Sequence, residues 1–136
     1  MAAMKDILVP LSPGELLDKI TILRIKVARI TDAAKRANVQ LELGLLEETW
    51  RESGCAAVDV SADERALQQV NERLWVVEDR IREKEAAQAF DADFIELARS
   101  VYVANDERAA IKKRVNVRLG SRIVEEKSYQ PYRATE

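Results

Sequence analysis

Histidine is absent from the 136-residue sequence, and Cys55 is its only cysteine. The chain therefore cannot form an intramolecular disulfide, a histidine-based zinc or iron site, or a nucleophile paired with an imidazole base. We expect no metal centre and no cofactor, and any acid or base chemistry would fall to carboxylates, lysine or tyrosine. Cys55 lies in an apparent connection between helices, and we interpret it as an incidental thiol.

Glycine and proline are also scarce, with 4 and 3 residues, and aromatic residues make up only 5% of the chain. Charged residues make up 34% and hydrophobic residues 47%, a mixture typical of long amphipathic helices. The length suits one core, so we treat residues 1–136 as a single helical domain.

Neither sign of charge dominates, since 22 basic and 24 acidic residues give a formal net charge of -2. The charges are interspersed, so no basic face predicts binding to nucleic acid. No apolar run approaches the length of a membrane-spanning helix or of a signal-peptide core. We therefore expect no membrane insertion and a location in a bacterial cytoplasm.

Four stretches carry apolar residues at alternating steps of three and four, the period of an amphipathic helix. They cover about residues 12–30, 33–53, 61–88 and 91–119, and the first and third open with Ser-x-x-Glu capping boxes. We predict an all-α bundle of four principal helices in two antiparallel hairpins. The second hairpin is longer and resembles a coiled coil in its heptad spacing.

Both ends of the chain are predicted to be extended. Residues 1–11 form an N-terminal arm in which Pro10 biases Val9 away from helix, and this arm is expected to pack along the bundle or add a short strand. Residues 120–136 form a C-terminal tail whose first half is expected to dock and whose last residues are expected to fray.

The first two helices are apolar on a second face. Ile22 and Ile25 lie off the main stripe of the first helix, and Leu41 and Leu45 lie off that of the second. A helix that is apolar on two sides must bury both, so these residues either make the helices central to the fold or contribute to a contact between subunits.

The apolar seam of the fourth helix is interrupted by Asn105 and Arg108. Antiparallel packing would bring them near Asn71 and Glu78, which occupy equivalent flanking positions of the third helix. One interpretation of this polar layer is a pocket for a small molecule or anion, with Arg108 as its electrostatic anchor. The other is a buried Arg-Glu pair that fixes the register of the bundle.

Asp18, Lys19 and Arg73 are three further candidates. Helical spacing places them off the apolar stripes of their helices, so spacing alone predicts a solvated face with ordinary exposed ion pairs. They become candidates because they lie in segments that resemble a known family.

Four segments carry that resemblance: 9–23 (VPLSPGELLDKITIL), 70–75 (VNERLW), 105–109 (NDERA) and 120–129 (GSRIVEEKSY). They resemble a family of short bacterial proteins described as a domain of unknown function, over about residues 8–129. The resemblance implies that a site would draw on residues within these segments, namely Ser12, Glu15, Asp18, Lys19, Asn71, Arg73, Asn105, Asp106 and Arg108. It also implies a protein partner linked to cell-surface polysaccharide synthesis.

Two classes of function fit these features. The first is a non-catalytic interaction or scaffold domain that forms a homodimer through the second apolar faces. The second is a bundle that binds a small anion, or that catalyses by positioning and charge alone, as the all-helical chorismate mutases do without histidine, metal or cofactor. The likeness to those enzymes is one of architecture only. We take the interaction domain as the leading hypothesis because the sequence lacks catalytic motifs.

Overall fold

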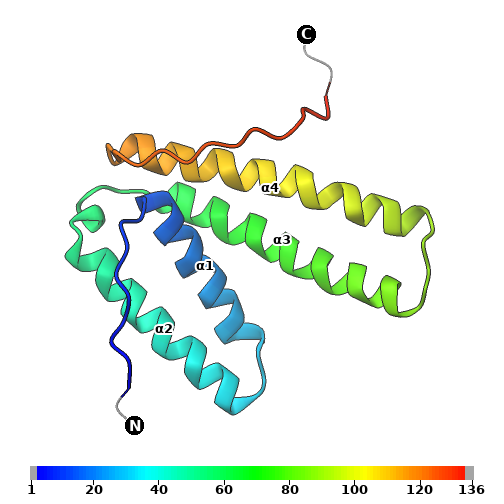
Figure 1. Ribbon diagram of the computed structural model, residues 1–136, viewed down its shortest axis with the longest axis horizontal. Coiled ribbons are helices and arrows are strands. Elements are labelled where there is room, and N and C mark those ends of the chain that lie inside the picture. Colours follow the sequence, from blue (N-terminus) through cyan, green and yellow to red (C-terminus); the bar gives the residue numbers. More distant parts are fainter. Residues whose placement is uncertain (1–2, 134–136) are drawn as a thin grey trace.

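The computed structural model describes residues 3–133, which form four α-helices and one short 3-10 helix. The helices are α1 (Pro13–Arg29), α2 (Ala33–Glu52), η1 (Cys55–Ala57), α3 (Ser61–Ala86) and α4 (Ala92–Arg118). Figure 1 shows that α1 and α2 form one antiparallel hairpin and α3 and α4 form a second. The predicted all-α fold is confirmed, and each long helix begins and ends within two residues of its predicted limits.

Helix α1 lies at the centre of the fold. It packs against α2 on one side and against α3 and α4 on the other, whereas α2 packs chiefly against α1 (Figure 1). Ile25 is buried and Ile22 is half-buried, so the second apolar face of this helix is used within the fold. Two roles were predicted for Ile22 and Ile25: a contact between subunits, or packing that makes the helix central to the fold. The structure shows the second role.

The main core lies where α1, α3 and α4 meet. Its buried side chains are Leu17, Val60, Leu67, Val70, Leu74, Ala104, Ile111 and Val115. Full burial of one leucine, isoleucine or valine contributes about 1.5–3 kcal/mol. Helices α3 and α4 contain 26 and 27 residues, against 17 and 20 for α1 and α2, so the longer hairpin extends past the shorter one (Figure 1). We call residues 80–100 the free end of this hairpin.

Local sequence accounts for most helix ends. Ser12 Oγ accepts a hydrogen bond of 3.2 Å from the Glu15 N–H at the start of α1. Gly54 and Gly120, with φ of 83° and 66°, follow α2 and α4 in the left-handed conformation that glycine adopts without a steric penalty.

The capping box predicted at Ser61 is wrong. Val60 is the residue that precedes α3, and the Asp59 carboxylate accepts the Ser61 N–H at 3.0 Å. The aspartate side chain satisfies this amide from two residues upstream, so Ser61 enters the first turn of the helix instead of capping it.

The N-terminal arm is extended, as predicted, but it buries no large apolar side chain among its described residues. Met4, Ile7 and Leu8 are all strongly exposed, and no strand forms in residues 3–133. The prediction that the arm packs along the bundle or adds a strand is therefore wrong. The consecutive apolar side chains Ile7, Leu8 and Val9 find no complementary groove on the bundle.

The C-terminal tail runs beside α4 after Gly120 (Figure 1). Its first half docks through polar contacts, and the predicted fraying of the last residues concerns positions 134–136, which lie outside the described residues. Among the described helices, none combines the length and the apolar character needed to cross a membrane.

Candidate functional site

A buried polar layer joins α1, α3 and α4. The side-chain amide of Asn71 donates to Asp18 Oδ1 at 2.9 Å and to Thr21 Oγ1 at 3.0 Å. Arg108 Nη1 donates to Asn71 Oδ1 at 3.4 Å, and Arg108 Nε lies 4.0 Å from Asp18 Oδ1. In the described part of the chain no buried side-chain nitrogen or oxygen lacks a hydrogen-bond partner, so the layer is fully satisfied.

Asp18 is the residue whose location differs most from expectation. It is 3% exposed, although its spacing in α1 predicted a solvated face. The prediction is wrong because α3 and α4 cover the side of α1 that α2 leaves free. A buried carboxylate without compensation is costly, and here the Asn71 amide and the Arg108 guanidinium compensate it. The Arg108 side chain is 30% exposed, so it links this layer to the surface.

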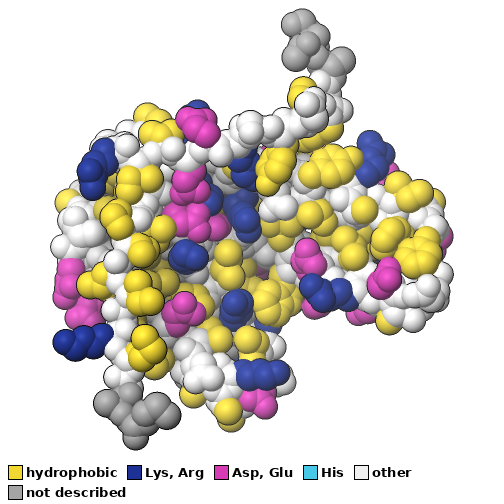
Figure 2. All heavy atoms as spheres, viewed as in Figure 1, with side chains coloured by type: hydrophobic (Ala, Val, Ile, Leu, Met, Phe, Trp, Pro, Cys, Tyr) yellow, Lys and Arg dark blue, Asp and Glu magenta, His cyan; other side chains and the backbone are white. Residues whose placement is uncertain are grey.

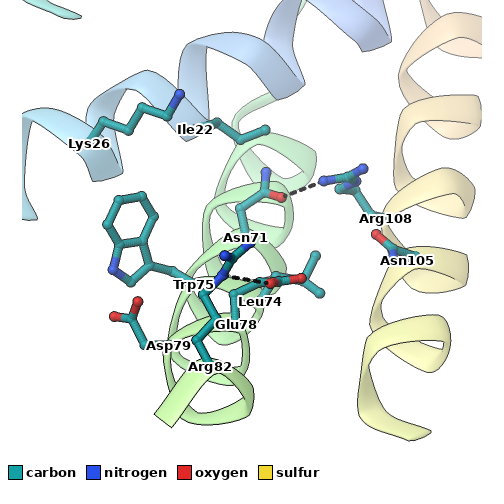
Figure 3. Close-up of a pocket in the computed structure, with 10 residues that line it drawn as sticks. All are labelled: Ile22, Lys26, Asn71, Leu74, Trp75, Glu78, Asp79, Arg82, Asn105 and Arg108. Atoms are coloured by element: carbon teal, nitrogen blue, oxygen red, sulfur yellow. Dashed lines mark hydrogen bonds and ion pairs between the residues drawn. The ribbon is translucent and has the colours of Figure 1, made fainter. Parts of the chain in front are cut away.

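An open groove of about 510 Å³ lies beside the polar layer, between α1 and the α3–α4 hairpin (Figure 3). The residues that line it are Ile22 and Lys26 of α1, Asn71, Leu74, Trp75, Glu78, Asp79 and Arg82 of α3, and Asn105 and Arg108 of α4. The predicted meeting of Asn71, Glu78, Asn105 and Arg108 is therefore confirmed. Helix α1 completes the groove, which the sequence did not indicate.

The predicted buried Arg-Glu pair does not form. Glu78 lies 3.6 Å from Arg82 on its own helix and is half exposed, whereas the carboxylate nearest to Arg108 is that of Asp18. Position 78 lies two turns beyond Asn71, where α1 no longer covers α3, so water reaches the Glu78 carboxylate and removes the need for a buried cation.

Lys19 and Arg73 lie away from the groove. Lys19 is 3.7 Å from Glu15 one turn earlier, and Arg73 pairs with Glu107 at the surface. Both are exposed ion pairs of the kind that spacing predicted, each worth tenths of a kcal/mol. The structure thus gathers Asp18, Asn71, Glu78, Asn105 and Arg108 and leaves these two outside.

A second ionic cluster fixes the start of α1 against α4 and the tail. Lys112 of α4 pairs with Glu15, and its Nζ lies 3.5 Å from Glu125 Oε2 in the tail. Glu125 Oε1 also accepts a hydrogen bond of 2.8 Å from Ser12 Oγ. Ser12 and Glu15, which the family resemblance singled out, therefore hold three parts of the chain together.

The charges of this cluster stabilise each other. Burial alone would raise the pKa of the Glu15 carboxyl, but the hydrogen bond and charge of Lys112 outweigh burial and hold that pKa below its usual 4.5. Burial alone would lower the pKa of Lys112, but Glu15 outweighs it and holds that pKa above its usual 10.5. Both groups are charged near neutral pH, unlike a general acid or base poised for proton transfer.

Gly14 allows α1 to approach α4 at this cluster. Its N–H donates to Asn116 Oδ1 at 2.7 Å, and a Cβ at this position would overlap the Lys112 carbonyl oxygen and lie 2.8 Å from Asn116 Oδ1. Residue spacing alone predicts only a helix start for this segment. The available signal was a glycine within the first turn, which lowers helix stability and so requires a packing reason.

The outer side of α2 is a separate candidate surface. None of the residues of α2 is buried, and its half-buried positions, Val39, Leu43, Leu46, Glu47 and Trp50, mark the inner side. On the opposite side, helical spacing aligns Ala34, Ala37, Leu41, Gly44 and Leu45, which are all exposed. We call these five residues the outer stripe. Leu41 and Leu45 are 67% and 46% exposed, one turn apart.

The charges of α2 match its helix dipole only in part, since the Asp32 carboxylate caps its N-terminus and Arg51 lies in its last turn, but other charges oppose the dipole. Lys35 and Arg36 lie in the first turn, which contains no acidic residue, while Glu48 and Glu52 lie in the last two turns beside Arg51. Cations near a helix N-terminus and anions near a C-terminus each disfavour the helix by about 0.3–1 kcal/mol at exposed positions. An external group of complementary charge would remove this penalty.

The fold and the site define an all-helical domain with a satisfied polar layer beside a groove and, within the described residues, no cluster of side chains that could hold a metal ion. The chain belongs to a family of unknown function (DUF6165), whose model matches residues 7–136, which confirms the resemblance. Neither a search of curated proteins nor a search of solved structures found a match.

Proposed function

We propose that this protein is a non-catalytic interaction domain that self-associates through the outer stripe of α2. The observation that supports the proposal is the pair of exposed leucines, Leu41 and Leu45, on the side of α2 that faces away from α1. Apolar side chains aligned on the free face of a helix are typical of a surface that another chain covers. Gly44, beside them, leaves room for a close approach of backbones, because a Cβ there would meet nothing within 4 Å.

The charges on the outer side of α2 favour a second copy of the chain in the antiparallel orientation. Helical spacing places Glu48 and Glu52 on the side of the outer stripe, whereas Lys35 and Arg36 lie toward α1, where Arg36 Nε donates to the Val27 carbonyl oxygen at 3.2 Å. In an antiparallel two-fold contact between two α2 helices, Glu48 and Glu52 of each copy would lie beside the N-terminal end of the other helix, whose dipole favours negative charge. A parallel contact would bring the carboxylates of the two copies side by side and is therefore disfavoured. On the family resemblance we extend the proposal to a scaffold role in the bacterial cytoplasm, for a partner in cell-surface polysaccharide synthesis.

Mass measurement in solution tests the self-association. We expect the wild-type chain to sediment at twice its 15.4 kDa mass and the double variant Leu41→Glu/Leu45→Glu to sediment as a monomer with an unchanged helical circular dichroism spectrum. Val117→Glu is the matched control, because Val117 is an exposed apolar residue of α4 outside the stripe, and it should leave the mass unchanged. A wild-type monomer at high protein concentration, or a double variant that remains dimeric, would rule the interface out.

Charge reversal tests the orientation. Glu48→Lys/Glu52→Lys should weaken the dimer, because the introduced cations would lie beside the positive N-terminal end of the partner's α2 in the antiparallel contact. A dimer of unchanged or greater stability in this variant would argue against the antiparallel arrangement.

A further inference from the structure

The groove between α1 and the α3–α4 hairpin is not used by the contact proposed for α2, and its lining has the features of a ligand site. We propose that this groove binds a small organic anion that carries a flat apolar portion. Three features of the groove support this proposal: a guanidinium held by Asn71 and Asp18, polar hydrogens without partners, and an apolar wall.

Arg108 is held in place before any ligand arrives. Its Nη1 donates to Asn71 Oδ1 (Figure 3). Its Nε lies 4.0 Å from Asp18 Oδ1, and rotation away would leave the buried Asp18 carboxylate without its cation. The described residues offer no hydrogen-bond partner to Nη2. A guanidinium fixed in this way loses little conformational entropy when it binds an anion, which favours affinity.

Lys26 supplies an unpaired positive charge of the groove. Asp18 offsets part of the charge of Arg108, and Arg82 lies near Glu78, whereas Lys26 has no carboxylate within 4.0 Å among residues 3–133. The Asp79 carboxylate also lines the groove and has no cation within that distance in the described residues, so the anionic group of a ligand would have to lie beside Lys26 and Arg108. The side-chain amide of Asn105 and the indole N–H of Trp75 also find no hydrogen-bond partner in that part of the chain. Three unused kinds of donor on one groove favour a ligand rich in acceptors and negative in charge.

The apolar wall of the groove indicates that the uncharged part of the ligand is apolar and flat. Trp75, Ile22 and Leu74 line the groove between Lys26 and the Asn105–Arg108 side (Figure 3). A flat ring can stack on an indole while its charged group reaches a neighbouring cation. The groove volume of about 510 Å³ lies within the roughly 300–1,000 Å³ typical of small-molecule sites.

The position of the tryptophans makes a direct binding assay possible. The chain has two, and Trp50 lies in a different cavity, between α1, α2 and α3, so Trp50→Phe leaves Trp75 as the only indole and as a reporter of the groove. The probe is anilinonaphthalenesulfonate, an aromatic anion, and its matched control is phenylnaphthylamine, which has the same rings without the sulfonate. We expect saturable quenching of Trp75 by one equivalent of the anion, and at least about tenfold weaker binding of the neutral probe, a difference of about 1.4 kcal/mol.

Two variants that leave the polar layer intact test the role of the groove. Lys26→Gln and Asn105→Asp should each weaken binding of the anionic probe about fivefold to tenfold, whereas Lys113→Gln, which removes an exposed cation of α4 outside the groove, should not change it. Leu41→Glu/Leu45→Glu should also bind normally, so failure of self-association and failure of this proposal are separate results. Equal affinity for the two probes, absence of saturable Trp75 quenching, or wild-type binding by Lys26→Gln would overturn it.

Discussion

Asn71 is the residue on which the polar layer depends, because it bonds to groups from both α1 and α4. We predict that Asn71→Leu lowers the free energy of unfolding by about 2–4 kcal/mol, since it leaves the buried Asp18 carboxylate and Thr21 hydroxyl without their donor. Urea denaturation followed by circular dichroism measures the change.

Asn105 provides the control for this substitution. It has the same side chain and lines the groove, but it has no hydrogen-bond partner within the described residues. Asn105→Leu should therefore change the free energy of unfolding by no more than about 0.5 kcal/mol. Equal effects of the two substitutions would show that the Asn71 hydrogen bonds do not stabilise the fold.

Gly14 and Gly44 differ in what surrounds their Cα atoms. A Cβ at Gly14 would overlap the backbone of α4, whereas a Cβ at Gly44 would meet nothing within 4 Å. We predict that Gly14→Ala destabilises the protein by about 1–3 kcal/mol through overpacking. In the Leu41→Glu/Leu45→Glu background, where the proposed contact through α2 is absent, Gly44→Ala should be neutral or stabilise by up to about 1 kcal/mol through helix propensity. Denaturation midpoints at one protein concentration compare each variant with its parent, and a Gly14→Ala variant as stable as its parent would contradict the close packing.

At this scale the sequence indicated some of the site. Asn105 and Arg108 could be found because polar residues interrupt an apolar seam, and Asn71 because its heptad position faces that seam. Asp18 could not be placed from spacing, since its burial depends on two helices that lie far along the chain. The pairing of Arg108 with Asp18 instead of Glu78 could not be predicted for the same reason.

Among the elements, the start of α1 depends on charge for its attachment to α4. The folded-state pKa of Glu15 lies below its usual value, so the Glu15–Lys112 pair stabilises the fold above about pH 4.5 and this stability is lost as pH falls through the lowered pKa. The pKa of Lys112 is raised, so its contribution is complete below about pH 10.5 and is lost as pH rises through the raised pKa.

The corresponding prediction concerns Glu15→Gln. Near neutral pH it should lower the free energy of unfolding by roughly 1–2 kcal/mol, the value of a charge-assisted hydrogen bond, and the difference from wild type should shrink as the solution is acidified below about pH 4. Glu96→Gln, which removes an exposed pair with Arg99 on α4, should give little difference at any pH. A difference for Glu15→Gln that does not depend on pH would argue against the ion pair as its cause.

Helix limits were predictable because they depend on neighbouring residues: Ser12 and Asp32 cap α1 and α2, and Gly54 and Gly120 follow α2 and α4. The exception at Ser61 arises because Asp59 competes for the same amide. The N-terminal arm shows the limit of such reasoning, since apolar β-branched residues indicate an extended backbone but not a surface for it to pack against.

For the molecule as a whole, stability should be uneven along the long hairpin. Its inner half packs against α1, but its free end, residues 80–100, consists of two helices beyond the other hairpin (Figure 1). Figure 2 shows hydrophobic side chains exposed over this end. We predict faster amide hydrogen exchange at the free end than at Leu67–Leu74 and Ile111–Val115, which lie in the main core. Uniform protection along α3 and α4 would indicate that another chain covers the free end.

The two hairpins and their unequal lengths were predictable because short connections join helices of known length. Their mutual arrangement was not, since periodicity shows which side of a helix is apolar but not which helix covers it. Helix α1 illustrates this: Ile22 and Ile25 fitted either a subunit contact or a central place in the fold, and only its packing against α3 and α4 decides between them.

The polar layer also bears on the order of events during folding. Each hairpin closes between helices that are adjacent in the chain, whereas the Asn71–Asp18 hydrogen bond joins residues 53 positions apart. The hairpins can therefore form first, with the Asp18 carboxylate still hydrated, and the layer is completed when they dock. We predict that desolvation of the carboxylate comes late in docking, after the main barrier. Loss of Asn71 should consequently accelerate unfolding more than it slows refolding, a pattern that the two arms of a chevron plot separate.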